Sequence, residues 1–177
     1  MNRGLAVMRL QPPHQGHRLV IETMLNECDE AVVAIGSVQE SRTAKNPLTF
    51  EERRMLLARL FPTSRLHIIG VSDIGAPTRA KWAHYVLDQV HENGLDAPTC
   101  YYGGSDADLS WFADIPGLAL RKVDREGIGR GISATGIRQG IVAGDREALL
   151  EIPEPIRERV AQLLNGLKVN DADRQAL

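Results

Sequence analysis

Short apolar runs alternate with longer amphipathic segments along most of this 177-residue chain. The run at 31–35, Ala-Val-Val-Ala-Ile, is apolar at every position, which is typical of a strand buried on both faces of a parallel sheet. Runs of this kind predict strands at 4–8, 31–35, 66–71, 99–102 and 118–123.

Apolar residues at helical spacing occupy the intervals between these strands. They predict helices at 16–27, 49–60 and 79–92. A loop is expected at 124–131, followed by a helical segment that breaks at the Ile-Pro-Glu-Pro run of 152–155. Strands that alternate with helices indicate an α/β fold with a doubly wound parallel sheet, whose ligands bind at the carboxyl ends of the strands.

Length and charge narrow the class of protein further. We expect a single domain over 1–169 and a polar, frayed tail at 170–177. The formal net charge of −2 gives no electrostatic case for binding nucleic acid or a membrane, and no apolar run approaches membrane-spanning length. Two cysteines without paired spacing fit a reducing compartment, so a cytoplasmic location is expected.

Two histidines, His14 and His17, lie where the first predicted strand turns into the first helix. The order of strand, turn with Gly16 and helix N-terminus suits phosphates, because unpaired backbone N–H groups and the helix dipole favour negative charge there. Two imidazoles could then donate hydrogen bonds to phosphate oxygens as charge builds in a transition state. Two other interpretations stay open: a solvated surface pair, and half of a zinc site that lacks an evident third ligand.

A second candidate phosphate site lies in the Ile-Ser-Ala-Thr-Gly-Ile-Arg segment at 132–138. Ser133 is predicted to cap a helix, and Thr135 and Arg138 add a hydroxyl and a guanidinium about one turn later. By itself the segment could be an ordinary capped helix with an exposed arginine. Together with the histidine pair it favours phosphate chemistry, since the two sites bracket one α/β unit.

Three stretches of the chain resemble a known enzyme family. Residues 9–17 read Arg-Leu-Gln-Pro-Pro-His-Gln-Gly-His, and residues 36–41 read Gly-Ser-Val-Gln-Glu-Ser. With Lys-Asn-Pro-Leu-Thr at 45–49, Glu-Arg at 52–53 and the segment at 133–138, they are similar to the motifs of archaeal-type nicotinamide mononucleotide (NMN) adenylyltransferases. That family belongs to the H-x-G-H nucleotidyltransferase superfamily. The resemblance runs from about residue 4 to about residue 165.

The resemblance implies a Rossmann-like nucleotidyltransferase fold and a reaction of NMN with ATP that gives NAD and pyrophosphate. The 5′-phosphate of NMN would attack the α-phosphorus of ATP in line. The protein would therefore position the substrates and stabilise charge on their phosphates. Mg²⁺ would be the cofactor, held mainly by the ATP phosphates and water, and no protein ligand for the metal is expected.

The same resemblance assigns residues to each substrate. The catalytic group would be His14, His17 and Arg138. ATP would be bound by Arg9, Gln11, Gly16, Ser133, Thr135 and Arg138, with Arg9 also placed to bind the NMN phosphate or to bridge the two substrates. NMN or NAD would be bound by Gly36, Ser37, Lys45, Arg53, Asp73 and Trp82. Trp82 could stack on the nicotinamide ring or pack in the core.

Two other functions are compatible with these motifs. One is a different adenylyl- or cytidylyltransferase acting on a phosphopantetheine, a flavin or a polyol phosphate, against which the stretches at 36–41 and 46–53 argue. The other is a module that senses NAD or ATP without turnover, against which the intact histidine pair and Arg138 argue. ATP and NMN are thus the expected substrates and NAD the expected product, and a homo-oligomer is left open.

Overall fold

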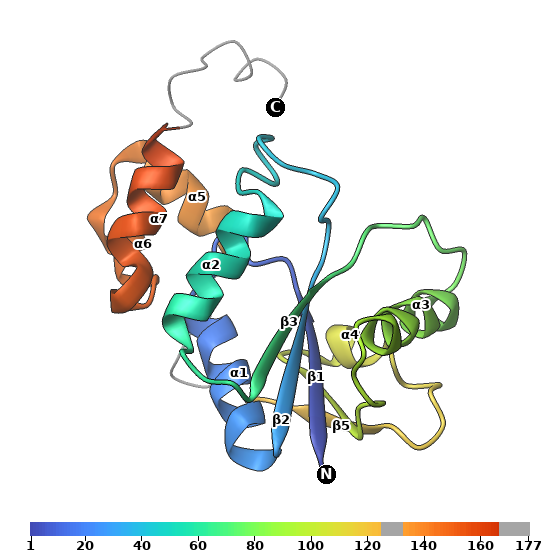
Figure 1. Ribbon diagram of the computed structural model, residues 1–177. Helices are drawn as coiled ribbons and strands as arrows, with labels where there is room; N and C mark the ends of the chain where they lie inside the picture. Colours follow the sequence, from blue (N-terminus) through green and yellow to red (C-terminus); the bar gives the residue numbers. More distant parts are fainter. Residues whose placement is uncertain (125–132, 167–177) are drawn as a thin grey trace.

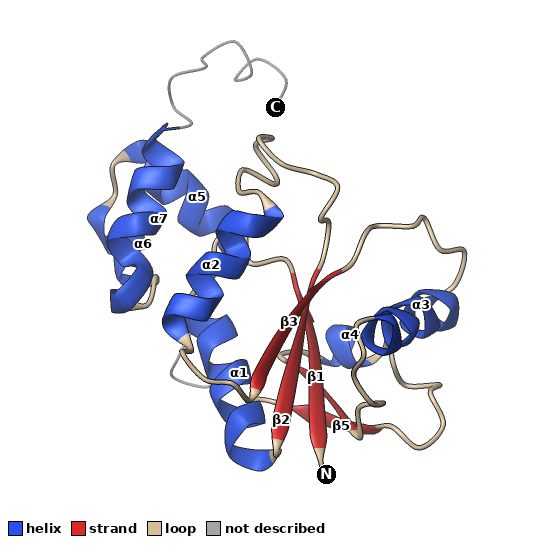
Figure 2. Ribbon diagram, in the orientation of Figure 1, coloured by secondary structure: helices blue, strands red, loops and turns tan. Residues whose placement is uncertain are grey.

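The computed structural model describes residues 1–124 and 133–166. Within them, five strands form one all-parallel sheet in the order β3-β2-β1-β4-β5 (Figure 2). The strands are β1 (Arg3–Met8), β2 (Glu30–Ile35), β3 (Leu66–Gly70), β4 (Cys100–Gly103) and β5 (Ala119–Lys122). The predicted doubly wound parallel sheet is therefore confirmed, and β1 lies at its centre.

Helices cover both faces of this sheet. Those described are α1 (Gln15–Glu27), α2 (Phe50–Leu60), α3 (Arg79–Glu92), α4 (Asp106–Leu109), α5 (Ala134–Ala143), α6 (Arg146–Leu150) and α7 (Glu154–Gly166). Helices α1 and α2 lie on one face and α3 and α4 on the other, while α5, α6 and α7 gather against α2 (Figure 1). Among the described helices, none is both long enough and apolar enough to span a bilayer.

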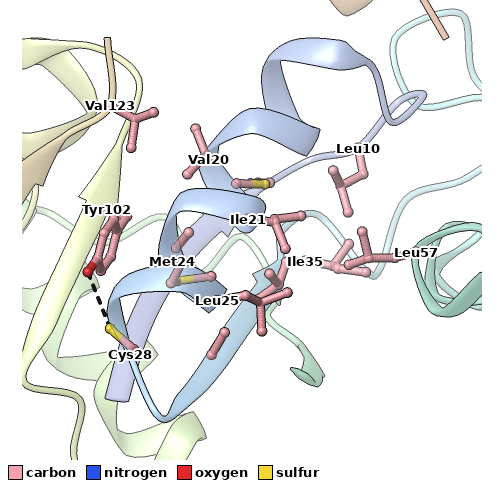
Figure 3. Close-up of a cluster of buried hydrophobic side chains, with 14 residues drawn as sticks. Leu10, Val20, Ile21, Met24, Leu25, Cys28, Ile35, Leu57, Tyr102 and Val123 are labelled. Atoms are coloured by element: carbon pink, nitrogen blue, oxygen red, sulfur yellow. Dashed lines mark hydrogen bonds between the residues drawn. The ribbon is translucent and has the colours of Figure 1, made fainter. Parts of the chain in front are cut away.

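The alternation along each strand divides the core between these two faces. In β2, Val33 and Ile35 pack towards α1, whereas Val32 and Ala34 pack towards α3. Because successive side chains of a strand point to opposite faces, an unbroken apolar run supplies both layers at once. Figure 3 shows the layer beneath α1, whose buried side chains include Val20, Ile21, Met24 and Leu25.

The predicted element positions are confirmed to within a few residues, with two features missed. The sequence analysis did not anticipate α4, a helix of only four residues. It also read one continuous helix where Gly144, in a left-handed conformation at φ 80°, ends α5 and Asp145 caps α6. Glycine after a helix and aspartate before one are ordinary stop and start signals, so this break was readable. Residues 125–131 of the expected loop, the boundary at 169 and the tail at 170–177 lie outside the described residues.

Gly4 of β1 lies against Met24 of α1 and Tyr102 of β4. A Cβ added there would lie 2.3 Å from Met24 Cγ and 3.0 Å from Tyr102 Cε2. We expect Gly4→Ala to lower the free energy of unfolding by about 1–3 kcal/mol, because extra volume in a packed core forces side chains from their preferred rotamers. Urea unfolding measures this. Gly166→Ala is the matched control, since nothing lies within 4 Å of its new Cβ, and equal stability of the two variants would contradict the prediction.

Candidate active site

A cleft of about 450 Å³ opens at the carboxyl ends of the central strands. The connection after β1 runs over one face of the sheet through α1, and the connection into β4 runs over the other through α3. The strand order reverses at this point, which is where α/β sheets bind ligands. Residues that directly follow strands line the cleft, among them Arg9 after β1, Gly36 and Ser37 after β2, and Gly104 after β4.

The two predicted histidines form the start of α1. His14 is its N-cap, and the His14 Nδ1 accepts a hydrogen bond from the Gly16 backbone N–H at 3.1 Å. The His17 Nδ1 in turn accepts from the His14 backbone N–H at 3.3 Å, and the ring centroids lie 3.7 Å apart. Because each Nδ1 accepts a backbone hydrogen, the proton of each neutral ring belongs on Nε2. In that tautomer the Nε2–H of each imidazole is a hydrogen-bond donor close to a helix N-terminus.

The two other interpretations of this pair find no support. His14 is only 4% exposed, so the rings are not a solvated surface pair. In the described part of the chain, no group of three or more His, Cys, Asp or Glu side chains could hold a metal ion. His17 and Gly16 line the cleft, as a phosphate-binding helix start requires.

The turn after β1 connects to the second predicted motif across 127 positions of sequence. Ser133 caps α5 by accepting from the Gly136 N–H at 3.0 Å, as predicted. Arg138 donates through Nη1 to the Gln11 backbone oxygen at 2.6 Å and through Nη2 to Thr135 Oγ1 at 3.2 Å. The fold thus brings the two candidate phosphate sites together. Ile132, at the start of the motif, lies outside the described residues.

The side chain of Gln11, which was predicted to contact ATP, is bonded to protein backbone in this structure. Its side chain is 1% exposed and holds the backbone of Leu48 from both sides. The amide Nε2 donates to the Leu48 carbonyl oxygen at 2.9 Å, and Oε1 accepts from the Leu48 N–H at 2.9 Å. The side chain therefore fixes the loop before α2 to the turn after β1, and it does not line the cleft.

Arg53 is also placed differently from the expectation of a substrate contact. It is fully buried, and Nη1 donates to the backbone oxygens of Arg9 at 2.8 Å and Gly36 at 2.7 Å. Nη2 donates to the Ser37 oxygen at 3.2 Å. Burial and the nearby charge of Arg9 lower the pKa of Arg53 to about 10, so it stays protonated at neutral pH. Arg53 lies behind the cleft wall and holds the backbone of that wall.

Two residues of these turns have strained backbones. Leu10 has φ 54° and Ser37 has φ 53°, in the left-handed region that side chains other than glycine rarely occupy. Each such residue costs roughly 1–3 kcal/mol and persists only where its surroundings hold it. The hydrogen bonds of Arg53 to the backbone at Arg9 and Ser37 supply part of that support.

The far end of the cleft is acidic and aromatic. Asp73 Oδ2 accepts from Ser37 Oγ at 2.6 Å and from Gln39 Nε2 at 3.1 Å, and it lines the cleft. Trp82 both packs at the edge of the core and lines the cleft, so the two interpretations of its role are compatible. Its ring meets Trp111 edge to face, with centroids 5.4 Å apart.

The structure adds two residues to this end and leaves one outside it. Trp111, which is 42% exposed, and Asp108 line the cleft, and neither was singled out from the sequence. Their position just after the fourth strand was the available signal, because ligand loops follow the carboxyl ends of strands. Lys45, predicted to contact NMN, is exposed on the loop before α2 and does not line the cleft.

The sheet order, the cleft at its reversal point and the paired phosphate motifs are features of a nucleotidyltransferase. Residues 9–140 match the family model described as cytidylyltransferase-like, which defines the class. The nicotinamide-nucleotide adenylyltransferase of Pyrococcus furiosus is 40% identical over 191 residues, covering 99% of this chain and 96% of the relative. That of Thermococcus kodakarensis is 31% identical at the same coverage of both chains. The chain belongs to the family of nicotinamide-nucleotide adenylyltransferases.

Solved structures agree on the fold. A bifunctional NMN adenylyltransferase/ADP ribose pyrophosphatase from Francisella tularensis superposes with a TM-score of 0.75 at 19% identity. The match covers 93% of this chain and 50% of the other, so this chain spans about half the length of that protein. At this identity the likeness concerns the Rossmann-like architecture.

Proposed function

We propose that this protein transfers the adenylyl group of ATP to NMN, giving NAD and pyrophosphate. The observation that carries the proposal is the hydrogen bond from Arg138 to Gln11, which brings the α5 motif to the turn that leads into the histidine pair. The resulting phosphate site adjoins a cleft whose other end carries Asp73 and Trp82. The names of the archaeal relatives support NMN as the acceptor.

The chemistry needs no general base. An oxygen of the NMN phosphate, already anionic, forms a bond to the α-phosphorus of ATP while the bond from that phosphorus to the bridging oxygen breaks. Pyrophosphate leaves with the electron pair. His14 and His17 donate hydrogen bonds through Nε2 to the ATP phosphates, and Arg138 neutralises their far end. Arg9, on the cleft wall, binds the acceptor's phosphate in line with the reacting bond.

The metal is proposed to enter with the nucleotide. Mg²⁺ keeps several of its waters and binds through a few oxygens, a role that the triphosphate fulfils. Bound there, Mg²⁺ would offset the charge of the phosphates.

One assay tests this function against its alternatives. Purified protein is incubated with ATP, Mg²⁺ and either NMN, nicotinate mononucleotide, 4′-phosphopantetheine, flavin mononucleotide or a polyol phosphate, and pyrophosphate and product are measured. NAD formation from NMN is the expected result. Turnover only with another acceptor would indicate a different nucleotidyltransferase. Nucleotide binding without pyrophosphate release would indicate a sensing module.

Trp82 is expected to contribute to NMN binding more than to ATP binding. If its ring stacks on nicotinamide, Trp82→Ala should remove about 1–2 kcal/mol of binding free energy for NMN. The KM for NMN should then rise roughly 5- to 30-fold, and the KM for ATP should stay nearly unchanged. Trp82→Phe, which keeps an aromatic face, should recover most of the loss. Steady-state kinetics with each substrate varied measures both constants. Equal changes in both, with a lower melting temperature, would assign Trp82 to the core alone.

A further inference from the structure

Arg53 is a fully buried cation. Among residues 1–124 and 133–166, no carboxylate lies within ion-pair distance of its guanidinium. Its described hydrogen bonds all go to backbone oxygens, and Nε donates to the Thr49 oxygen at 3.2 Å. A buried charge is costly unless its donors are satisfied, so this arrangement is a built feature of the site wall.

The oxygens that it binds belong to two separate turns. One turn follows β1 and carries Arg9, and the other follows β2 and carries Gly36 and Ser37. Because β1 and β2 are neighbours in the sheet, one planar guanidinium spans both turns. It therefore sets the separation between the Arg9 backbone and the Gly36–Ser37 backbone, which form adjacent parts of the cleft wall.

Charge adds to this geometry. Burial and the charge of Arg9 lower the pKa of Arg53 and of Arg138, so the Arg9 guanidinium lies within electrostatic reach of both of these groups at the end of β1. Like charges held close in the free protein attract a multiply charged anion, which relieves their repulsion. A phosphate monoester has that charge, and Arg9 is the member of the three that lines the cleft.

We infer that Arg53 is a positioning residue for the phosphate of the acceptor nucleotide. It acts through Arg9 and through the Gly36–Ser37 backbone, and it does not itself touch substrate. The identity of the acceptor as NMN rests on the proposed function.

The first test compares Arg53→Lys with Arg54→Lys. Lysine keeps the charge, but a single ammonium cannot span both turns as the planar fork does. Arg53→Lys should raise the KM for NMN on the order of tenfold or more, while the KM for ATP changes less than about threefold. Arg54, the next residue of α2, is exposed and paired with Glu51, so its substitution should leave both constants unchanged.

A merely structural role gives a different result. It would lower the melting temperature, and it would lower the apparent kcat because a smaller fraction of the protein is folded. Both KM values would stay unchanged, and that outcome overturns the inference. Wild-type protein that makes no NAD from NMN would instead reject the proposed function. The inference is then decided by calorimetric titration of the same variants with NMN, where an unchanged dissociation constant in Arg53→Lys overturns it.

A second pair of variants tests whether Arg53 holds the turn after β2, without altering Arg53 itself. Ser37→Ala and Ser37→Gly both lose the hydroxyl that bonds Asp73, but only glycine adopts the left-handed backbone freely. With Arg53 in place the turn is held, so the two should agree in KM for NMN within about threefold, although alanine melts lower.

In the Arg53→Lys background, the KM for NMN of the Ser37→Ala protein should exceed that of the Ser37→Gly protein on the order of tenfold. If Arg53→Lys does not fold, the pair with Arg53 intact decides the question. A KM for NMN far higher in Ser37→Ala than in Ser37→Gly would show that Arg53 does not hold the turn, and would overturn the inference.

Discussion

Replacing His17 by alanine is expected to lower kcat for NAD formation by roughly 10²-fold or more, because it removes a donor aimed at charge that develops in the transition state. The His17 ring is preorganised for this task. Its Nδ1 accepts from the His14 N–H, which places the proton on Nε2, and its ring packs against that of His14. The tautomer of His17 and the position of its ring are thus set by the fold.

The same substitution has a smaller effect on stability. It removes one half of the capping box of α1, an interaction worth about 0.5–2 kcal/mol, and the His14 cap remains. Circular dichroism and a melting curve should therefore report a folded protein at the assay temperature, so that the loss of kcat reflects chemistry.

His84→Ala is the control for this experiment. His84 is exposed on α3, where its Nδ1 lies 2.8 Å from the Ala80 oxygen, and it does not line the cleft. The control should keep kcat within about twofold of wild type. Near-normal turnover by a folded His17→Ala protein would remove His17 from the mechanism.

Substitutions of Arg138 are expected to impair the use of ATP in two steps. Arg138→Lys keeps the charge but loses the planar fork. The KM for ATP should therefore rise and kcat should fall, so that kcat/KM for ATP decreases by about tenfold. Arg138→Ala also loses the charge and should lower kcat/KM for ATP by roughly 10²-fold or more. The affinity for NMN, measured by calorimetry without ATP, should change little.

The geometry explains why the lysine variant is not conservative. The guanidinium already donates one hydrogen to the Gln11 oxygen and one to Thr135 Oγ1, and a five-donor fork keeps others for phosphate. An ammonium that replaces it carries all its donors on one nitrogen, so it cannot bind the Gln11 oxygen and a phosphate oxygen in the spaced, planar geometry of the guanidinium. Burial and the charge of Arg9 lower the pKa of Arg138.

Arg146→Lys controls for a general effect of an arginine-to-lysine exchange in the C-terminal helices, since Arg146 is exposed on α6. It should leave both substrates' constants unchanged. The assignment fails if Arg138→Ala weakens NMN binding alone. Arg138 would then belong to the acceptor's phosphate, and the orientation of the two substrates in the cleft would be the reverse of the one proposed.

The sequence by itself determined the order of elements, the parallel sheet and the positions of the two phosphate motifs. These features depend on residues close together in the sequence: apolar periodicity within a segment indicates a helix or a strand, and a capping residue marks where a helix begins. Thr49, which caps α2, and Ser133, which caps α5, are examples. The family motifs lie in the same short segments, so the reaction class was readable from them.

Only the tertiary structure decided where the polar side chains of those motifs point. Gln11 and Arg53 read as substrate contacts, yet they bind backbone groups 37 and 44 positions away. Trp111 joined the cleft because α4 packs beside α3, and Arg138 reached the turn after β1 because α5 returns to the end of that strand. A hydrogen-bonding side chain takes the partner that the assembled strands and helices bring within about 3 Å, and its neighbours in the sequence carry no information about that partner.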